Sequence, residues 1–132
     1  MTNRKTWARD ALISLLLAAG YMLIFAYNNT PLGAAIGSDN AMYLTMGTAL
    51  AKGYAPYTEI FDHKGPLLFL LQLLPQAVSG GYSLTAVFIQ ETLVLFACLM
   101  MMRAIAKELD VCPWAAQLVY MAMTCAFMDG GN

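Results

Sequence analysis

Two charged side chains in one polar segment of this chain have the chemistry to take up a proton and to bind an anion. Asp39 follows Ser38 at a predicted helix start, where a carboxylate can act as a general base or hold a cation. Lys64 precedes Gly65-Pro66, a pair typical of a helix start, so its ammonium would add to the positive end of that helix and favour a phosphate. The alternatives are an ordinary N-cap for the aspartate and a simple interfacial anchor for the lysine.

Three further residues complete the predicted binding set. Tyr43 lies one helical turn after the aspartate and shares a face with it. If its segment is extended, Asp62 lies on the same side as the lysine, and His63 on the opposite side. Asp129 would reach the same membrane surface, the alternative being a turn residue before two glycines. His63 and Glu59 are expected to be scaffold rather than reactive groups.

The composition indicates that membrane helices position these residues. Of the 132 residues 60% are hydrophobic and only 11% are charged, whereas soluble domains are nearer one half and one quarter. The net charge of −1 and the lack of a basic run exclude a nucleic-acid partner. The three cysteines have no CxxC spacing, which disfavours zinc or a disulfide framework. The chain is therefore predicted to be an integral membrane protein.

Hydropathy and helix-breaking residues predict an all-α, polytopic fold. Apolar runs of about 16 to 20 residues predict transmembrane helices, whereas shorter runs indicate helices at the membrane surface. The 28–81 segment would form the first loop outside the cytoplasm. The three predicted transmembrane helices are 11–27, 83–102 and 113–128, with a juxtamembrane helix over 39–51 and a short non-spanning apolar helix over 66–79.

The basic residues give the predicted orientation. Lys and Arg near helix ends mark the cytoplasmic side. Three of them precede the first predicted span, and Arg103 and Lys107 follow the second. An even number of crossings must then separate the two groups, so the apolar run over 66–79 does not span. We expect a membrane protein with a cytoplasmic N-terminus.

Glu91 offers an alternative function. It lies near the middle of the predicted span over 83–102, where a charge costs about 3 kcal/mol or more unless it faces protein, faces a cavity or is protonated. It would then belong to an ion or proton path, as in a small channel, a transporter subunit or an assembly protein. The other interpretation is a packing contact between helices, which the neighbouring Gln90 favours.

Three motifs in the polar segment resemble the N-terminal region of family 39-type glycosyltransferases. These are multi-spanning GT-C enzymes related to protein O-mannosyltransferases and lipid A aminoarabinose transferases. The resemblance covers nearly the whole chain, so 1–132 is expected to be the N-terminal part of a GT-C transmembrane domain and inactive alone. The motifs are Asp39-Asn40-Ala41-Met42-Tyr43, Gly53-Tyr54-Ala55-Pro56-Tyr57 and Phe61-Asp62-His63-Lys64-Gly65-Pro66-Leu67, and the closing Asp129-Gly130-Gly131-Asn132 is similar to a loop of bacterial members.

The resemblance implies transfer of a hexose or pentose from a polyprenyl-phosphate donor to a glycan, lipid or protein acceptor. Transfer would take place on the extracytoplasmic face of the bacterial plasma (inner) membrane. It implies that Asp39 is the catalytic carboxylate and that Lys64 contacts the carrier phosphate. Many members have a second acid where this chain has Asn40, and Lys-Pro-Pro where it has Lys64-Gly65-Pro66. The asparagine argues against a divalent metal, and no cofactor is predicted.

Overall fold

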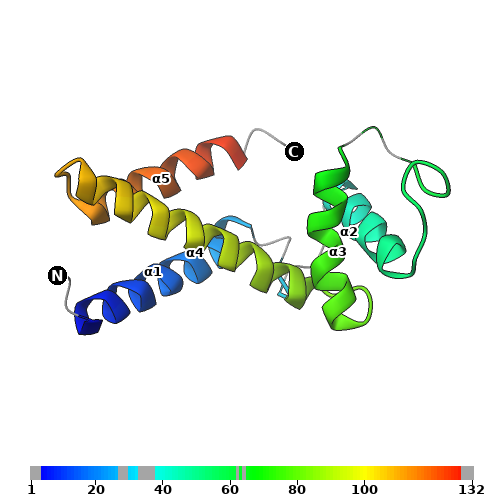
Figure 1. Ribbon diagram of the computed structural model, residues 1–132, viewed down its shortest axis with the longest axis horizontal. Coiled ribbons are helices and arrows are strands. Elements are labelled where there is room, and N and C mark those ends of the chain that lie inside the picture. The colour runs from blue at the N-terminus through cyan, green and yellow to red at the C-terminus, as the bar shows by residue number, and fades with distance from the viewer. Residues whose placement is uncertain (1–3, 27–29, 33–37, 62, 64, 129–132) are drawn as a thin grey trace. The chain divides into compact units, whose positions relative to one another are not determined.

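The protein is described by a computed structural model that covers residues 4–26, 30–32, 38–61, 63 and 65–128, without the side chains of 4, 38–40 and 125–128. These residues form helices and connecting turns, and their only β-type pairing is an isolated bridge between Pro56 and Ile60. The predicted all-α fold class is confirmed for this part of the chain. Its helices are α1 (Arg4–Phe25), α2 (Ser38–Ala51), α3 (Pro66–Ser79), α4 (Leu84–Glu108) and α5 (Pro113–Met128) (Figure 1).

The helix boundaries follow the local signals for starting and stopping a helix. α2, α3 and α5 agree with their predicted ranges to within one residue. α3 has Pro66 at its start and ends at Gly80, which has the left-handed φ of 75° that favours glycine. α1 and α4 extend beyond the predicted apolar runs into charged residues. Charge ends a hydrophobic run, but it does not break backbone hydrogen bonding, so the helices continue beyond those runs.

Within the described residues, two helices are long and apolar enough to cross a membrane, Lys5–Phe25 of α1 and Leu84–Glu108 of α4. The described part of α5 has 16 residues, or about 24 Å at 1.5 Å per residue, against a hydrocarbon layer of about 30 Å. The structure therefore does not support the predicted third span over 113–128.

Glu91 lies seven residues after Leu84 in α4. The residues by which α4 extends beyond the predicted end at 102 are partly charged, so Glu91 stays near the middle of the apolar part of the helix. Its side chain is half-buried and takes part in an interaction within the chain.

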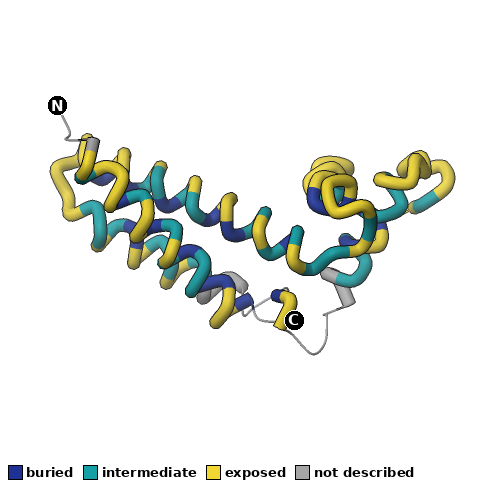
Figure 2. Tube along the Cα trace, turned by 90° about the horizontal axis from the view of Figure 1, so that it is seen from below, coloured by how far each residue is buried: buried dark blue, intermediate teal, exposed yellow. Residues whose placement is uncertain are grey.

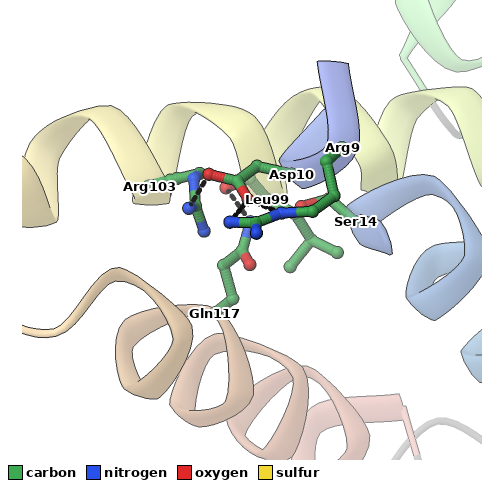
Figure 3. A network of polar contacts seen from close by, with 6 residues as sticks. All are labelled: Arg9, Asp10, Ser14, Leu99, Arg103 and Gln117. Atoms are coloured by element: carbon green, nitrogen blue, oxygen red, sulfur yellow. Dashed lines mark hydrogen bonds and ion pairs between the residues drawn. The ribbon is translucent and has the colours of Figure 1, made fainter. Parts of the chain in front are cut away.

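The chain divides into two compact units. One contains Met1–Ala26 and Glu91–Asn132, and the other contains Tyr27–Gln90, so α4 begins in the second unit and continues into the first. In the first unit α1, the later part of α4 and α5 contact one another through polar side chains (Figure 3). Their outward positions are mostly exposed (Figure 2). The exposed apolar side chains of these helices include Leu12, Leu16, Ile24, Val94, Met101, Leu118 and Val119.

The second unit is built on close packing of α2 against α3. Gly47 of α2 is buried, and a Cβ atom added there would lie 2.6 Å from the backbone oxygen of Gln72 in α3. Leu44 and Met46 of α2 and Phe69 of α3 are buried beside this contact. The two helix backbones can approach this closely only because residue 47 has no side chain.

Gly47→Ala is therefore expected to destabilise the full chain by about 1–3 kcal/mol, because the new methyl group meets a backbone atom that cannot move aside cheaply. Thermal unfolding in detergent measures this change. The matched control is Gly20→Ala in α1, where the added Cβ meets nothing within 4 Å. That variant should be neutral or slightly stabilising. Equal effects of the two substitutions would contradict the close approach.

Candidate functional site

The structure places part of the predicted site on one helix. Asp39 is the second residue of α2, and Tyr43 follows one turn later with a half-buried side chain. The side chain of Asp39 lies outside the described residues, as do Asp62, Lys64 and Asp129 entirely. The helix that carries the aspartate and the tyrosine is confirmed, and the grouping of these residues with the other three stays a prediction.

The start of α3 has the features expected of an anion-binding helix end. Gly65 is extended, with φ −71° and ψ 151°, and Pro66 occupies the start of the helix. Gly65 makes no side-chain capping bond, and the first turn carries no acidic residue. A helix N-terminus bears a partial positive charge, and here no side chain of the described first turn neutralises it. Lys64 is therefore next in sequence to a helix end that favours a phosphate.

The connection between α2 and α3 contains a turn closed by its own backbone. The carboxylate of Glu59 accepts the N–H of Ala55 at 2.6 Å, and the N–H of Glu59 donates to the carbonyl of Ala55 at 3.1 Å. The N–H of Tyr57 donates to the carbonyl of Ile60 at 2.6 Å, and Tyr57 has a left-handed φ of 65°. Glu59 thus closes the turn through its carboxylate, and its predicted role as scaffold stays a prediction.

Aromatic rings hold this turn against α3. The ring of Tyr57 lies 6.1 Å from that of Phe69 and 6.3 Å from that of Phe61, measured between centroids. Phe69 is almost fully buried, whereas Tyr57 and Phe61 are exposed. Distances in this range suit tilted and edge-on aromatic pairs. The residues that precede Lys64 are thus fixed to the same helix whose start follows it.

A second polar cluster, which sequence reasoning missed, joins the helices of the first unit (Figure 3). Arg103 of α4 forms an ion pair with Asp10 of α1, and only 8% and 10% of their side chains are exposed. Arg9 also contacts Asp10, at 3.1 Å, but 66% of its side chain is exposed. The guanidinium of Arg103 lies 4.2 Å from the centre of the Trp114 ring in α5, within cation–π range.

Gln117 of α5 completes this cluster. Its Nε2 donates to the hydroxyl of Ser14 at 2.9 Å and to the carbonyl of Leu99 at 2.9 Å (Figure 3). Gln117 and Ser14 are fully buried. One amide thus connects all three helices of the unit.

The pairings also fix the directions of the helices. Asp10 of α1 pairs with Arg103 of α4, whereas Ser14, one turn later in α1, and Leu99, one turn earlier in α4, both accept from the amide of Gln117, so α1 and α4 are antiparallel. Arg9 and Arg103 consequently lie at the same end of the helix pair.

A signal for the cluster was present in the sequence. Asp10 directly precedes the apolar run over 11–27, Arg103 directly follows the one over 83–102, and Gln117 is the one amide in the uncharged run over 113–128. Opposite charges at the ends of two antiparallel apolar helices can pair, and a lone amide in an apolar helix needs a partner. Which of several basic residues pairs with Asp10 does not follow from these patterns.

Among the described residues, no group of three or more His, Cys, Asp or Glu side chains could hold a metal ion. Comparison of the chain with protein-family models, with curated proteins and with solved structures finds no match.

Proposed function

We propose that this chain carries the donor-binding part of a membrane glycosyltransferase, which moves a sugar from a polyprenyl-phosphate carrier to an acceptor outside the cytoplasm. The observation that carries the proposal is the start of α3 at Pro66, with an extended Gly65, no side-chain cap and no acid in its first turn. This supports a phosphate site at Lys64, the residue before Gly65. The Lys64 ammonium and the helix end would act on the same phosphate.

The chemistry requires a base and a stabilised leaving group. In the proposed reaction Asp39 takes the proton of the acceptor hydroxyl, whose oxygen attacks the anomeric carbon of the donor sugar. The bond between that carbon and the carrier phosphate breaks, and Lys64 stabilises the negative charge on the released polyprenyl phosphate. Tyr43, Asp62 and Asp129 are proposed to bind the substrates. Asp39 in the first turn of α2 and one turn before Tyr43 supports this division of roles.

The fold of the first unit supports the proposed topology. Arg9 and Arg103 lie at one end of antiparallel helices, and cationic ends of spans face the cytoplasm. The chain between α1 and α4 would then lie on the outer side. We also propose that α5 is embedded in the membrane, because Gln117 bonds to α1 and to α4.

Lys64→Met is expected to lower kcat/KM for the lipid-linked donor by about 10²–10³-fold, because it removes a cation from the developing phosphate charge. The assay follows radiolabelled sugar from a synthetic polyprenyl-phosphate donor in membranes that contain the longest native reading frame with this sequence. Lys52→Met is the matched control, since Lys52 is an exposed lysine of the same loop. Equal rates for the two variants would overturn the role of Lys64.

The alternative of a channel or transporter centred on Glu91 has weaker support. Glu91 is half-buried and already has an interaction within the chain. A carboxylate in an apolar helix that faces protein needs no ion path to explain its presence.

A further inference from the structure

α3 has its polar and apolar faces reversed relative to a helix on the surface of a soluble protein. Its two glutamines face inward, with Gln76 fully buried and Gln72 half-buried where its backbone meets Gly47. The opposite face is aliphatic, without a charged group, and its five large side chains are 42% to 87% exposed. These five residues are Leu67, Leu70, Leu71, Leu74 and Val78, defined here as the α3 leucine face.

Hydrogen bonds at the end of α3 fix this rotational setting. The side-chain oxygen of Gln76 accepts the N–H of Ser83 at 2.9 Å, and its backbone carbonyl accepts the N–H of Gly81 at 2.9 Å. Ser83 in turn caps α4, because its hydroxyl accepts the N–H of Ala86 at 3.2 Å. Rotating α3 to bury its leucine face would break the bond between Gln76 and the start of α4.

The spacing of the leucine face is that of one helix side. Its members follow at intervals of three, one, three and four residues, which keeps them within one apolar stripe. A stripe of this kind without a charge between its members is an apolar patch of the type that marks a membrane or protein contact. α2 and the aromatic turn pack on other parts of α3, through Gly47 and Phe69 respectively, so neither of these contacts covers the stripe.

Two observations identify lipid acyl chains as the occupant of this face. α3 has 14 residues, about 21 Å, which is too short to cross a hydrocarbon layer of about 30 Å. Only the segment 80–83 separates it from α4, a helix long and apolar enough to span, and the Gln76–Ser83 bond ties the two together. The exposed face is therefore continuous along the chain with a helix that enters the bilayer. Exposed Tyr82 in the connecting segment suits the polar boundary of the bilayer.

We propose that α3 lies in the membrane surface, with its leucine face in the acyl region of the leaflet that α4 enters and its two glutamines on the opposite side, packed within the protein. Helices of this kind bind a leaflet through their buried apolar face. The inference does not depend on the glycosyltransferase proposal, because it uses neither Asp39 nor Lys64. Its test has no activity readout, so either proposal can fail alone.

The experiment places an NBD fluorophore on Leu74→Cys in the full chain, with its three native cysteines replaced by serine, reconstituted in phosphatidylcholine–phosphatidylglycerol vesicles. We expect blue-shifted emission and at least about threefold stronger quenching by doxyl-labelled acyl chains than for the control. The control is Lys52→Cys, a charged and exposed position of the same unit. Leu70→Cys gives the same readout from the preceding turn if the first variant does not fold.

Two results would overturn the proposal. Emission at the wavelength found in water, with quenching no stronger than at position 52, would leave the leucine face in solvent. Blue-shifted emission without doxyl quenching would show that another helix or a second copy of the chain covers it. Strong quenching at both positions 70 and 74, with weak quenching at 52, is the expected pattern.

Discussion

Replacing Asp39 by asparagine is expected to reduce sugar transfer by about 10²–10⁴-fold, because the amide cannot accept the proton of the acceptor hydroxyl. The substitution is conservative for the fold. Asparagine suits the start of a helix as well as aspartate does, and Asp39 lies in the first turn of α2. The loss should therefore appear in the turnover rate at saturating donor, measured in membranes with the longest native reading frame. The amount of inserted protein should stay the same.

Asp110→Asn is the matched control for this experiment. Asp110 is an exposed carboxylate in the turn between α4 and α5, with a left-handed φ of 54° that asparagine also tolerates. It should leave transfer unchanged. A fully active Asp39→Asn enzyme would remove the assignment of the base, and an equal loss in both variants would point to a general effect of charge.

Arg103→Leu is expected to lower the midpoint of thermal unfolding in detergent by about 10 °C or more. The substitution leaves Asp10 at the end of α1 without its nearly buried partner, and it removes the guanidinium from the Trp114 ring. Asp10 would keep its contact with the largely exposed Arg9, but loss of the nearly buried partner of a nearly buried charge strongly destabilises a folded protein. The double variant Asp10→Leu/Arg103→Leu should recover much of the loss, because it removes both charges.

Arg9→Leu tests whether an ion pair with Asp10 must be buried to stabilise the fold. Arg9 contacts the same carboxylate at 3.1 Å, but its side chain is largely exposed, and exposed ion pairs contribute little to stability. Its replacement should shift the midpoint by about 2 °C or less. If Arg103→Leu were no more damaging than Arg9→Leu, the buried pair would not hold α1 to α4.

Local signals explain why most helix positions could be predicted. Gly65-Pro66 and Gly80-Gly81 bound α3, and Pro113 begins α5, so their ranges follow from turn chemistry and apolar runs. Helix ends within charged sequence were harder to place. α4 continues to Glu108 because Arg103 and Lys107 interrupt hydropathy without interrupting the helix.

Contacts between distant residues account for what could not be predicted. Asp10 and Arg103 are 93 positions apart, and Ser14 and Gln117 are 103 apart. Charge sign alone allows several pairings, and only the packing of the three helices selects one. The role of Gly47 could not be predicted for the same reason, since a glycine within a helix gives no indication of which backbone approaches it.

The same distinction between local signals and distant contacts applies to the candidate site. Helix capping predicts that α2 begins beside Asp39 and that Tyr43 shares a face with it, and turn chemistry predicts the helix start after Lys64. Bringing the aspartate and the lysine to one substrate depends on how the 38–66 segment folds as a whole. Periodicity and capping describe single helices, so they do not determine the distance between Asp39 and Lys64.

The most direct measurement for the proposed function is release of polyprenyl phosphate from a synthetic polyprenyl-phosphate-linked sugar. It is made in vesicles that contain the native reading frame, with donor supplied on the extracytoplasmic side. The account predicts acceptor-dependent release together with sugar transfer by the wild type, and almost none by Asp39→Asn. Wild-type release no faster than that of Asp39→Asn, across a series of donor sugars and with both proteins folded, would contradict it.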